Sequence, residues 1–78
     1  DIRFLESLLA VVESGSIAAA ARRQGLTPAA VGQRVKALED LLGVELLQRS
    51  GHRAHPTEAT LNLLPRARRL LQEARALK

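Results

Sequence analysis

Apolar residues recur along the first part of this chain with the spacing of an α-helix. In residues 2–14 they fall at positions i, i+3, i+4 and i+7, on one face of a helix; they are Leu5, Leu8, Leu9 and Val12. Gly15 follows directly, and glycine is common at a helix C-terminus because it adopts the left-handed conformation without strain. The pattern predicts a first helix over 2–14.

Two further helices are predicted at short intervals. Ser16 is a favourable N-cap for the Ala-rich segment 17–24, which ends before Gly25. Thr27 is the next N-cap, and a third helix over 28–42 begins with proline at its first position. Its apolar stripe, at steps of four, three and four, consists of Val31, Val35, Leu38 and Leu42.

The second half of the chain predicts a hairpin and a long helix. Ser50 and Gly51 are a turn signal between two short segments, so we expect a β-hairpin within 46–56. Thr57 can cap a last helix, whose apolar stripe repeats at steps of four and three and consists of Leu63, Ala67, Leu70, Ala74 and Leu77, with Leu64 and Leu71 beside it. Pro65 predicts a bend, or a helix that is regular only from Leu64 onward.

The second and third helices fit a helix-turn-helix. Ala21, Gly25 and Val31 stand at offsets of four and six. A small residue allows the next helix to cross closely, glycine allows the tight turn, and valine fills the angle between the helices. With the hairpin, the expected fold is mainly α: a three-helix winged helix-turn-helix over 1–56 with a β-hairpin wing, followed by a long C-terminal helix over 57–78.

Composition limits the core and the compartment. The chain has 78 residues, a single aromatic residue (Phe4) and no cysteine. A chain of this length forms one small domain whose core is built from aliphatic side chains of packed helices. We expect a cytoplasmic protein, because neither disulfides, a signal peptide nor a membrane-spanning run is indicated.

The charge distribution favours a polyanionic partner. The net charge is +4, and residues 16–56 carry six basic and three acidic groups, a net of +3. Four of these basic residues, Arg34, Lys36, Arg49 and Arg53, are expected to be unopposed, because the acidic residues lie together near the end of the third helix. Such a field suits nucleic acid, although ordinary solvated charge would produce the same balance.

The third helix begins with small residues and continues with long polar ones. Pro28, Ala29, Ala30 and Gly32 make up its front. A helix that enters the major groove, which is about 12 Å wide, has to bring its backbone close to the base edges, and bulky side chains would prevent this. Gln33 pairs well with adenine, and Arg34 with guanine. The residues expected to contact DNA are Thr27, Pro28, Ala29, Gly32, Gln33, Arg34 and Lys36 on this helix and Arg49, His52 and Arg53 on the wing.

The whole pattern resembles the N-terminal DNA-binding domain and linker helix of LysR-type transcriptional regulators. The residues that carry the resemblance are VVESGSIAAAARRQGLTPAAVGQRVKALEDLLGVELLQRSGHR, followed by PTEA and LLPRARRLL. The resemblance implies sequence-specific binding of double-stranded DNA by a homodimer, with the recognition helix in the major groove and the wing on the backbone or the minor groove. A small-molecule effector would bind only through a domain that is not present in this chain.

Several positions depart from the usual residues of that family. Gly32 replaces a typical serine, which weakens the helix by roughly 0.5–1 kcal/mol relative to alanine. Pro28 replaces a common base-contacting glutamine. The other departures are Ala18 for serine or threonine, Gln24 for leucine, Leu47 for phenylalanine and Thr60 for glycine. They affect the base preference more than the fold.

Some single residues also have a second interpretation. Arg49 can pair with Glu39 or Glu45 instead of contacting DNA. His52 and His55 are spaced three apart, but zinc needs at least three protein ligands, so no metal site and no cofactor are expected.

The last helix and the whole domain also leave alternatives open. The stripe of the last helix either pairs with a second copy of the chain, the interpretation we favour, or covers the domain's own core. A winged-helix module that binds another protein is the alternative to DNA binding. The sequence shows no nucleophile paired with a base and no phosphate-binding loop, so we do not expect an enzyme.

Overall fold

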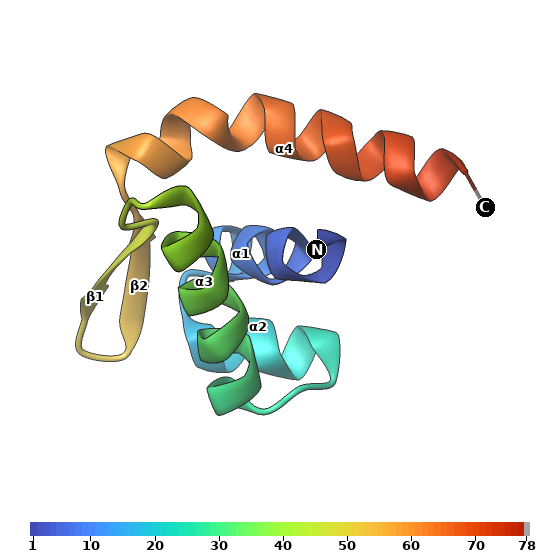
Figure 1. The fold of residues 1–78 in the computed structure, drawn as a ribbon. Helices are drawn as coiled ribbons and strands as arrows, with labels where there is room; N and C mark the ends of the chain where they lie inside the picture. Colours follow the sequence, from blue (N-terminus) through green and yellow to red (C-terminus); the bar gives the residue numbers. More distant parts are fainter. Residues whose placement is uncertain (78) are drawn as a thin grey trace.

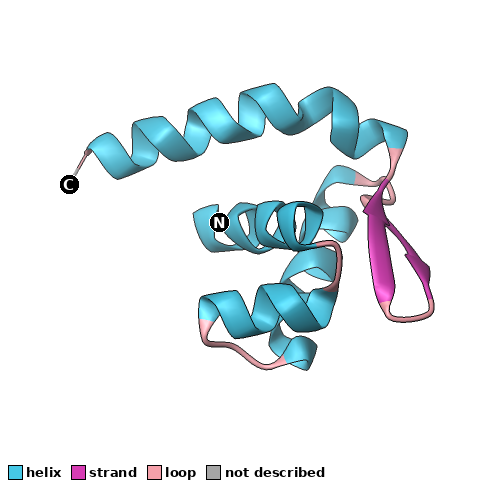
Figure 2. Ribbon diagram, turned by 180° about the vertical axis from the view of Figure 1, so that it is seen from behind, coloured by secondary structure: helices cyan, strands magenta, loops and turns pink. Residues whose placement is uncertain are grey.

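The computed structural model describes residues 1–77 and contains four helices and one hairpin (Figure 1). The elements are α1 (Ile2–Ser14), α2 (Ile17–Gln24), α3 (Pro28–Leu42), β1 (Leu47–Ser50), β2 (Arg53–Pro56) and α4 (Glu58–Ala76). The three predicted helices and the hairpin are confirmed with these bounds. The fold is therefore mainly α. The hairpin lies beside α3, and α4 lies along α1 (Figure 1), as Figure 2 shows from behind.

The first three helices share one aliphatic core. The stripe of α3 meets α1 and α2, so that Leu8, Val11, Val31 and Val35 are at most 1% exposed. Small residues on α2 complete this core, because Ala20 and Ala21 allow its neighbours to approach closely. This packing fixes which face of α3 is buried and which face is free.

The turn between α2 and α3 has the predicted geometry. Gly25 has a φ of +67°, in the left-handed region that favours glycine. Leu26, the next residue, folds back onto α2, because its N–H donates a hydrogen bond to the carbonyl of Ala21 at 2.9 Å. Thr27 caps α3 by accepting a hydrogen bond from the Ala30 N–H at 3.1 Å. These local bonds set the close crossing of the two helices.

The hairpin is fixed to the helical core at both of its ends. Its strands are antiparallel, with Leu47 opposite Pro56 and Ser50 opposite Arg53. Near the turn, the Ala54 N–H donates to the carbonyl of Gly15 at 3.0 Å. At the other end, the carbonyl of Leu46, which is fully buried, accepts from the Thr60 hydroxyl at 2.6 Å. The wing is therefore held in a fixed position relative to α1 and α4.

Helix α4 continues through Pro65 as one gently arched helix (Figure 1). Of the two outcomes predicted for Pro65, the helix that is regular only from Leu64 is wrong, because α4 is continuous from Glu58, whereas the arch of α4 agrees with the predicted bend. Pro65 is exposed, so the carbonyl of Leu61, which receives no proline N–H, lies on the solvent side of the helix. The missing hydrogen bond is tolerated because solvent can take its place.

Helix α4 packs along α1 through a second apolar cluster. Leu64, Ala67 and Leu71 contact Leu9 and are at most 7% exposed. Arg75 adds an ion pair with Glu6 at 3.8 Å. Part of the α4 stripe thus covers the core of its own chain. Among residues 1–77, no helix has the length and apolar character needed to cross a membrane.

Candidate nucleic-acid interface

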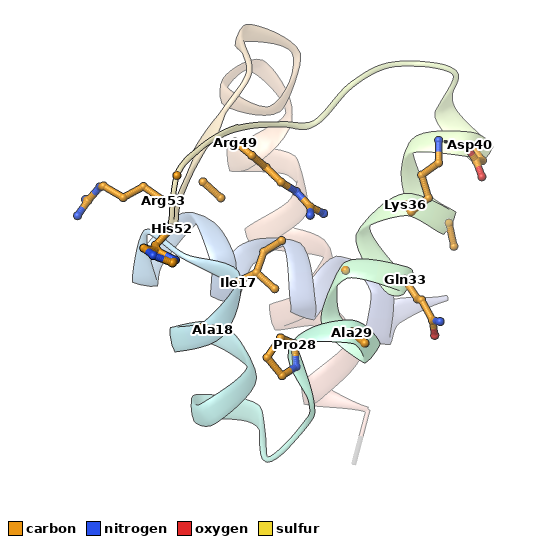
Figure 3. Close-up of a pocket in the computed structure, with 14 residues that line it drawn as sticks. Ile17, Ala18, Pro28, Ala29, Gln33, Lys36, Asp40, Arg49, His52 and Arg53 are labelled. Atoms are coloured by element: carbon orange, nitrogen blue, oxygen red, sulfur yellow. Dashed lines mark ion pairs between the residues drawn. The ribbon is translucent and has the colours of Figure 1, made fainter.

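A solvent-open hollow of about 740 Å³ lies between α3 and the hairpin (Figure 3). We call it the cationic hollow. Its lining comes from three elements: Ile17 and Ala18 of α2; Pro28, Ala29, Gly32, Gln33, Lys36, Ala37 and Asp40 of α3; and Arg49, Gly51, His52, Arg53 and Ala54 of the hairpin. Most of the predicted DNA-contact residues are therefore brought together on one surface.

The α3 wall of the hollow is the small, free face of that helix. Pro28 and Ala29 are exposed at its N-terminus, and Gln33 follows one turn later, also exposed. The opposite face carries Val31 and Val35, which are buried in the core. Helix α3 thus presents a narrow, accessible edge at the place where the sequence predicts base contacts.

Arg49 extends from β1 into the hollow toward α3 (Figure 3). A Cβ atom placed on Gly32 would lie 3.7 Å from Nη2 of Arg49, an ordinary van der Waals distance. Within residues 1–77 Arg49 forms no ion pair, so its predicted alternative pairing with Glu39 or Glu45 is wrong. Glu39 instead accepts the backbone N–H of Leu46 at 2.7 Å. The guanidinium is consequently available to an anion in the hollow.

Lys36 is not unopposed, as the charge pattern had suggested. Its Nζ atom lies 3.0 Å from Oδ1 of Asp40, one helical turn further on, and both side chains are exposed. The hydrogen bond from Lys36 to Asp40 raises the pKa of this lysine above its ordinary value. The carboxylate offsets the charge that Lys36 contributes to the hollow.

The tip of the wing contributes a further cation close to the backbone of the α1–α2 turn. Nη2 of Arg53 lies 3.3 Å from the position that a Cβ atom on Gly15 would occupy. Gly15 itself has a φ of +82°, so a side chain there would be strained as well as crowded. His52 lies beside Arg53 at the hairpin turn and is exposed. Both wing residues thus stand where the sequence predicts a second contact with DNA.

Arg34 lies apart from the cationic hollow, and the prediction that groups it with Gln33 needs correction. It is half-buried, and its Nη1 atom donates a hydrogen bond to the Ser7 hydroxyl of α1 at 3.4 Å. Successive residues of a helix are rotated by about 100°. Gln33 can therefore face the hollow while the next side chain turns toward the core. Thr27 is also outside the lining, and its hydroxyl caps α3.

Several lining residues were missing from the sequence prediction. Ile17 and Ala18 enter the hollow from the start of α2, and Gly51 and Ala54 enter from the hairpin. They are small or apolar and carry no chemical signal of their own. The spacing of the Lys36–Asp40 pair, i to i+4 on a predicted helix, is the one signal that could have identified Asp40.

A second groove, of about 630 Å³, lies on the other side of α3. We call it the apolar groove. It is lined by Asp1, Ile2 and Leu5 of α1, Leu38 and Leu42 of α3, and Leu63, Arg66, Ala67 and Leu70 of α4. Of the six residues of the last helix that are predicted for dimerisation, three line this groove (Leu63, Ala67 and Leu70) and three do not (Leu71, Ala74 and Leu77).

The other predicted dimerisation residues differ in their exposure. Leu71 is only 2% exposed because it packs on α1, so its assignment to a dimer surface was wrong. Ala74 is half-buried, and Leu77 is 89% exposed at the end of α4. No group of three potential metal ligands occurs within residues 1–77.

Comparisons with known proteins agree on one family. The family described as bacterial regulatory helix-turn-helix protein, lysR family, matches residues 2–61. The putative HTH-type transcriptional regulator protein PtxE of Stutzerimonas stutzeri is 43% identical over 76 residues, which are 96% of this chain and 39% of that protein. An uncharacterized HTH-type transcriptional regulator of Azotobacter vinelandii is 45% identical over 71 residues, which are 91% of this chain and 49% of that protein. The chain thus spans less than half the length of these relatives.

Solved structures give the same result. The DNA-binding domain of CbnR in complex with DNA superposes with a TM-score of 0.91 at 39% identity, covering 95% of this chain and 85% of that one. The DNA-binding domain of BenM in complex with benA site 1 DNA has a TM-score of 0.89 at 26% identity, covering 99% of this chain and 86% of that one. In both cases nearly the whole chain takes part in the match.

Proposed function

The chain belongs to the LysR family of bacterial regulatory helix-turn-helix proteins, and from this premise we propose that it binds double-stranded DNA in a sequence-specific manner as the DNA-binding part of a transcription regulator. The similar domains of CbnR and BenM were both solved in complex with DNA. In this proposal residues 1–56 are the winged helix-turn-helix domain, and the segment that follows, with α4, serves as the linker and dimerisation helix.

The observation that carries the proposal is the cationic hollow between α3 and the wing. When a helix lies in the major groove and a wing lies in the adjacent minor groove, the sugar–phosphate backbone that separates the two grooves runs between them. The hollow is open, and small residues at Ala18, Ala29 and Gly32 leave room in it. Arg49 supplies the cation that a phosphate requires.

The lining residues divide into two roles. Gln33, exposed one turn into α3, reads a base edge, and adenine is its best partner. Pro28, Ala29 and Gly32 have no donor in their side chains, and they allow the helix to approach the bases. Arg49, His52 and Arg53 contact phosphates or the minor groove. Lys36 makes a weaker contact with DNA, because its ammonium group is already paired with the carboxylate of Asp40.

A homodimer is part of the proposal, and the apolar groove supports it. Leu70 is 51% exposed, and it lines the groove together with Leu63 and other aliphatic side chains, with Asp1 and Arg66 as the charged members of the lining. An α4 helix of a second copy can cover this groove and bury apolar area of both chains. Two helix-turn-helix units would then bind two half-sites related by a dyad. This chain covers less than half of the length of these relatives, and a small-molecule effector, as the family resemblance implies, would act through an additional domain.

Selection of bound sequences from a random duplex pool tests specificity and half-site symmetry together. We expect a pool enriched in one motif with dyad symmetry. Titration of the selected duplex at rising salt should give a log K that falls linearly with log [salt], because neutralised phosphates release counterions. An affinity that does not change with salt, or a pool without any enriched motif, would contradict DNA recognition and favour the protein-binding alternative.

A further inference from the structure

A buried hydroxyl connects the three helices of the core. Ser7 of α1 is fully buried. Its hydroxyl donates a hydrogen bond to Oε1 of Gln24, at the end of α2, at 2.8 Å, and accepts one from Nη1 of Arg34, on α3, at 3.4 Å. A hydroxyl can donate and accept at the same time. One side chain of α1 is therefore bonded to both helices of the helix-turn-helix; we call Ser7, Gln24 and Arg34 the polar triad.

We propose that the polar triad is a positioning device for DNA recognition. Arg34 acts on DNA binding through Ser7, by fixing the rotation of α3 against α1 and α2, and its guanidinium makes no contact with DNA. The inference rests on the proposed function and assigns Arg34 a role different from that of its neighbour Gln33.

The burial of Ser7 at the centre of the triad supports this role. No buried side-chain nitrogen or oxygen within residues 1–77 lacks a hydrogen-bond partner, and the Ser7 hydroxyl bonds only to Gln24 and Arg34. Loss of either partner leaves a buried polar group incompletely satisfied, which is unfavourable in a core that is otherwise aliphatic. The native arrangement of the three helices is thus preferred over a rotated one that separates these groups.

The position of Arg34 on α3 couples the triad to the hollow. Arg34 does not line the cationic hollow, whereas Gln33, the preceding residue, does. The two side chains are about 100° apart around the helix axis. Any rotation of α3 that breaks the bond to Ser7 therefore also moves Gln33 relative to the wing. Fixing Arg34 on the core side fixes the direction of Gln33 on the DNA side.

The test compares single and double variants on the duplex selected by the unaltered chain. Arg34→Ala should lower the affinity ratio of selected over scrambled duplex by about fivefold, the effect of one hydrogen bond, and Ser7→Ala should lower it at least as much, because it also removes the bond to Gln24. The double variant should lose no more than Ser7→Ala alone, because Ser7→Ala already removes the bond to Arg34. Arg34→Ala should leave the salt slope and the selected motif unchanged.

Two controls separate positioning from other effects. Gln33→Ala should change the selected motif and should be less than additive with Ser7→Ala, because the triad acts through the direction of Gln33. Leu9→Ala, which removes a buried side chain between α1 and α4, controls for a general loss of stability and should keep the affinity ratio. All variants are compared in buffer in which a urea titration shows them to be folded.

Three results would overturn the positioning role while DNA binding itself stands. The first is that Arg34→Ala flattens the dependence of log K on log [salt] by about 0.9, which indicates a phosphate contact. The others are that Arg34→Ala changes the selected motif at one position, or that Leu9→Ala lowers the ratio of selected over scrambled affinity as much as Arg34→Ala does. If the unaltered chain binds no duplex at all, the proposed function fails, and the inference fails with it.

Discussion

Helix α3 lines two surfaces of opposite character. On one side, small residues of α3 such as Ala29 form the cationic hollow together with cations of the hairpin such as Arg49. On the other, Leu38 and Leu42 of the same helix form part of the apolar groove. The two openings are similar in volume, about 740 and 630 Å³, so their size does not distinguish them. The difference lies in the chemistry of the side chains.

This difference predicts two kinds of binding energy. A cationic surface with small residues gains from phosphate neutralisation and is weakened by salt. An apolar surface gains from removal of area from water, at about 25 cal/mol per Å², and is hardly affected by salt. A dimeric DNA-binding protein needs both surfaces, one for DNA and one for the second copy. Helix α3 contributes to both of them because its two faces carry different residues. The predictions below alter one surface at a time.

The largest effect is expected where α4 packs on α1, outside the lining of the apolar groove. Leu71→Ala removes a side chain that is 2% exposed and packed on α1, so the free energy of unfolding should fall by about 2–5 kcal/mol. Urea unfolding measures it. Leu77→Ala, at a position 89% exposed, is the matched control and should change stability by less than about 0.5 kcal/mol. Equal effects of the two variants would show that α4 does not pack on α1.

The next effect concerns the proposed partner of the apolar groove. Leu70→Asp places a charge on a side chain that is 51% exposed in the single chain. The dimer should weaken by about 1.5–3 kcal/mol or more, the value of burying one leucine, because a carboxylate cannot be buried there without a partner. Sedimentation equilibrium measures the dissociation constant. A monomeric unaltered chain would remove the proposed dimer.

A smaller effect is expected in the cationic hollow. Arg49→Ala should flatten the dependence of log K on log [salt] by about 0.9, because one phosphate contact is lost. Arg69→Ala removes the same charge from the exposed face of α4, outside the hollow, and should leave the slope unchanged. Titration of labelled duplex at several salt concentrations compares the variants. The same slope for both variants would mean that Arg49 acts only through net charge.

The smallest effect is expected from the ion pair at the edge of the hollow. Asp40→Asn removes the carboxylate that pairs with Lys36, so the lysine becomes available to a phosphate. Affinity for duplex should rise by about twofold, a small change typical of an exposed pair, and the salt slope should become steeper. Lys36→Ala in the same background should abolish the gain. The pKa of Lys36 should fall toward its ordinary value without Asp40, which an NMR titration above pH 9 can follow.

Most of the fold could be predicted from the sequence, because its signals are local. Ser16 and Gly25 cap α2 in the structure as predicted, since a cap depends on hydrogen bonds within three or four residues of the helix end. The helical stripes of α1 and α3 predicted most of their buried residues for the same reason, but Leu42, predicted in the α3 stripe, is 50% exposed. Pro65 was the exception, because whether α4 tolerates a proline at this position depends on which side of the helix faces solvent.

The candidate site could be predicted only in part. The front of α3 and the wing were identified, since small residues followed by long polar ones form a pattern in the sequence. The direction of Arg34 and the pairing of Lys36 were not identified. Both depend on neighbours, Ser7 and Asp40, whose distance from the side chain is set by packing and by the choice of rotamer.

Helix α4 separates what the sequence determines from what only the tertiary structure decides. The sequence by itself determines that residues 58–76 form an amphipathic helix with leucines at steps of three and four. Two rows satisfy this spacing, one through Leu63 and Leu70 and one through Leu64 and Leu71, and they share Ala67. The fold buries the second row, because α1 lies beneath it, and the first row is left at the edge of the apolar groove. Spacing fixes a face of a helix, but only the neighbouring element determines which of two adjacent rows is removed from water.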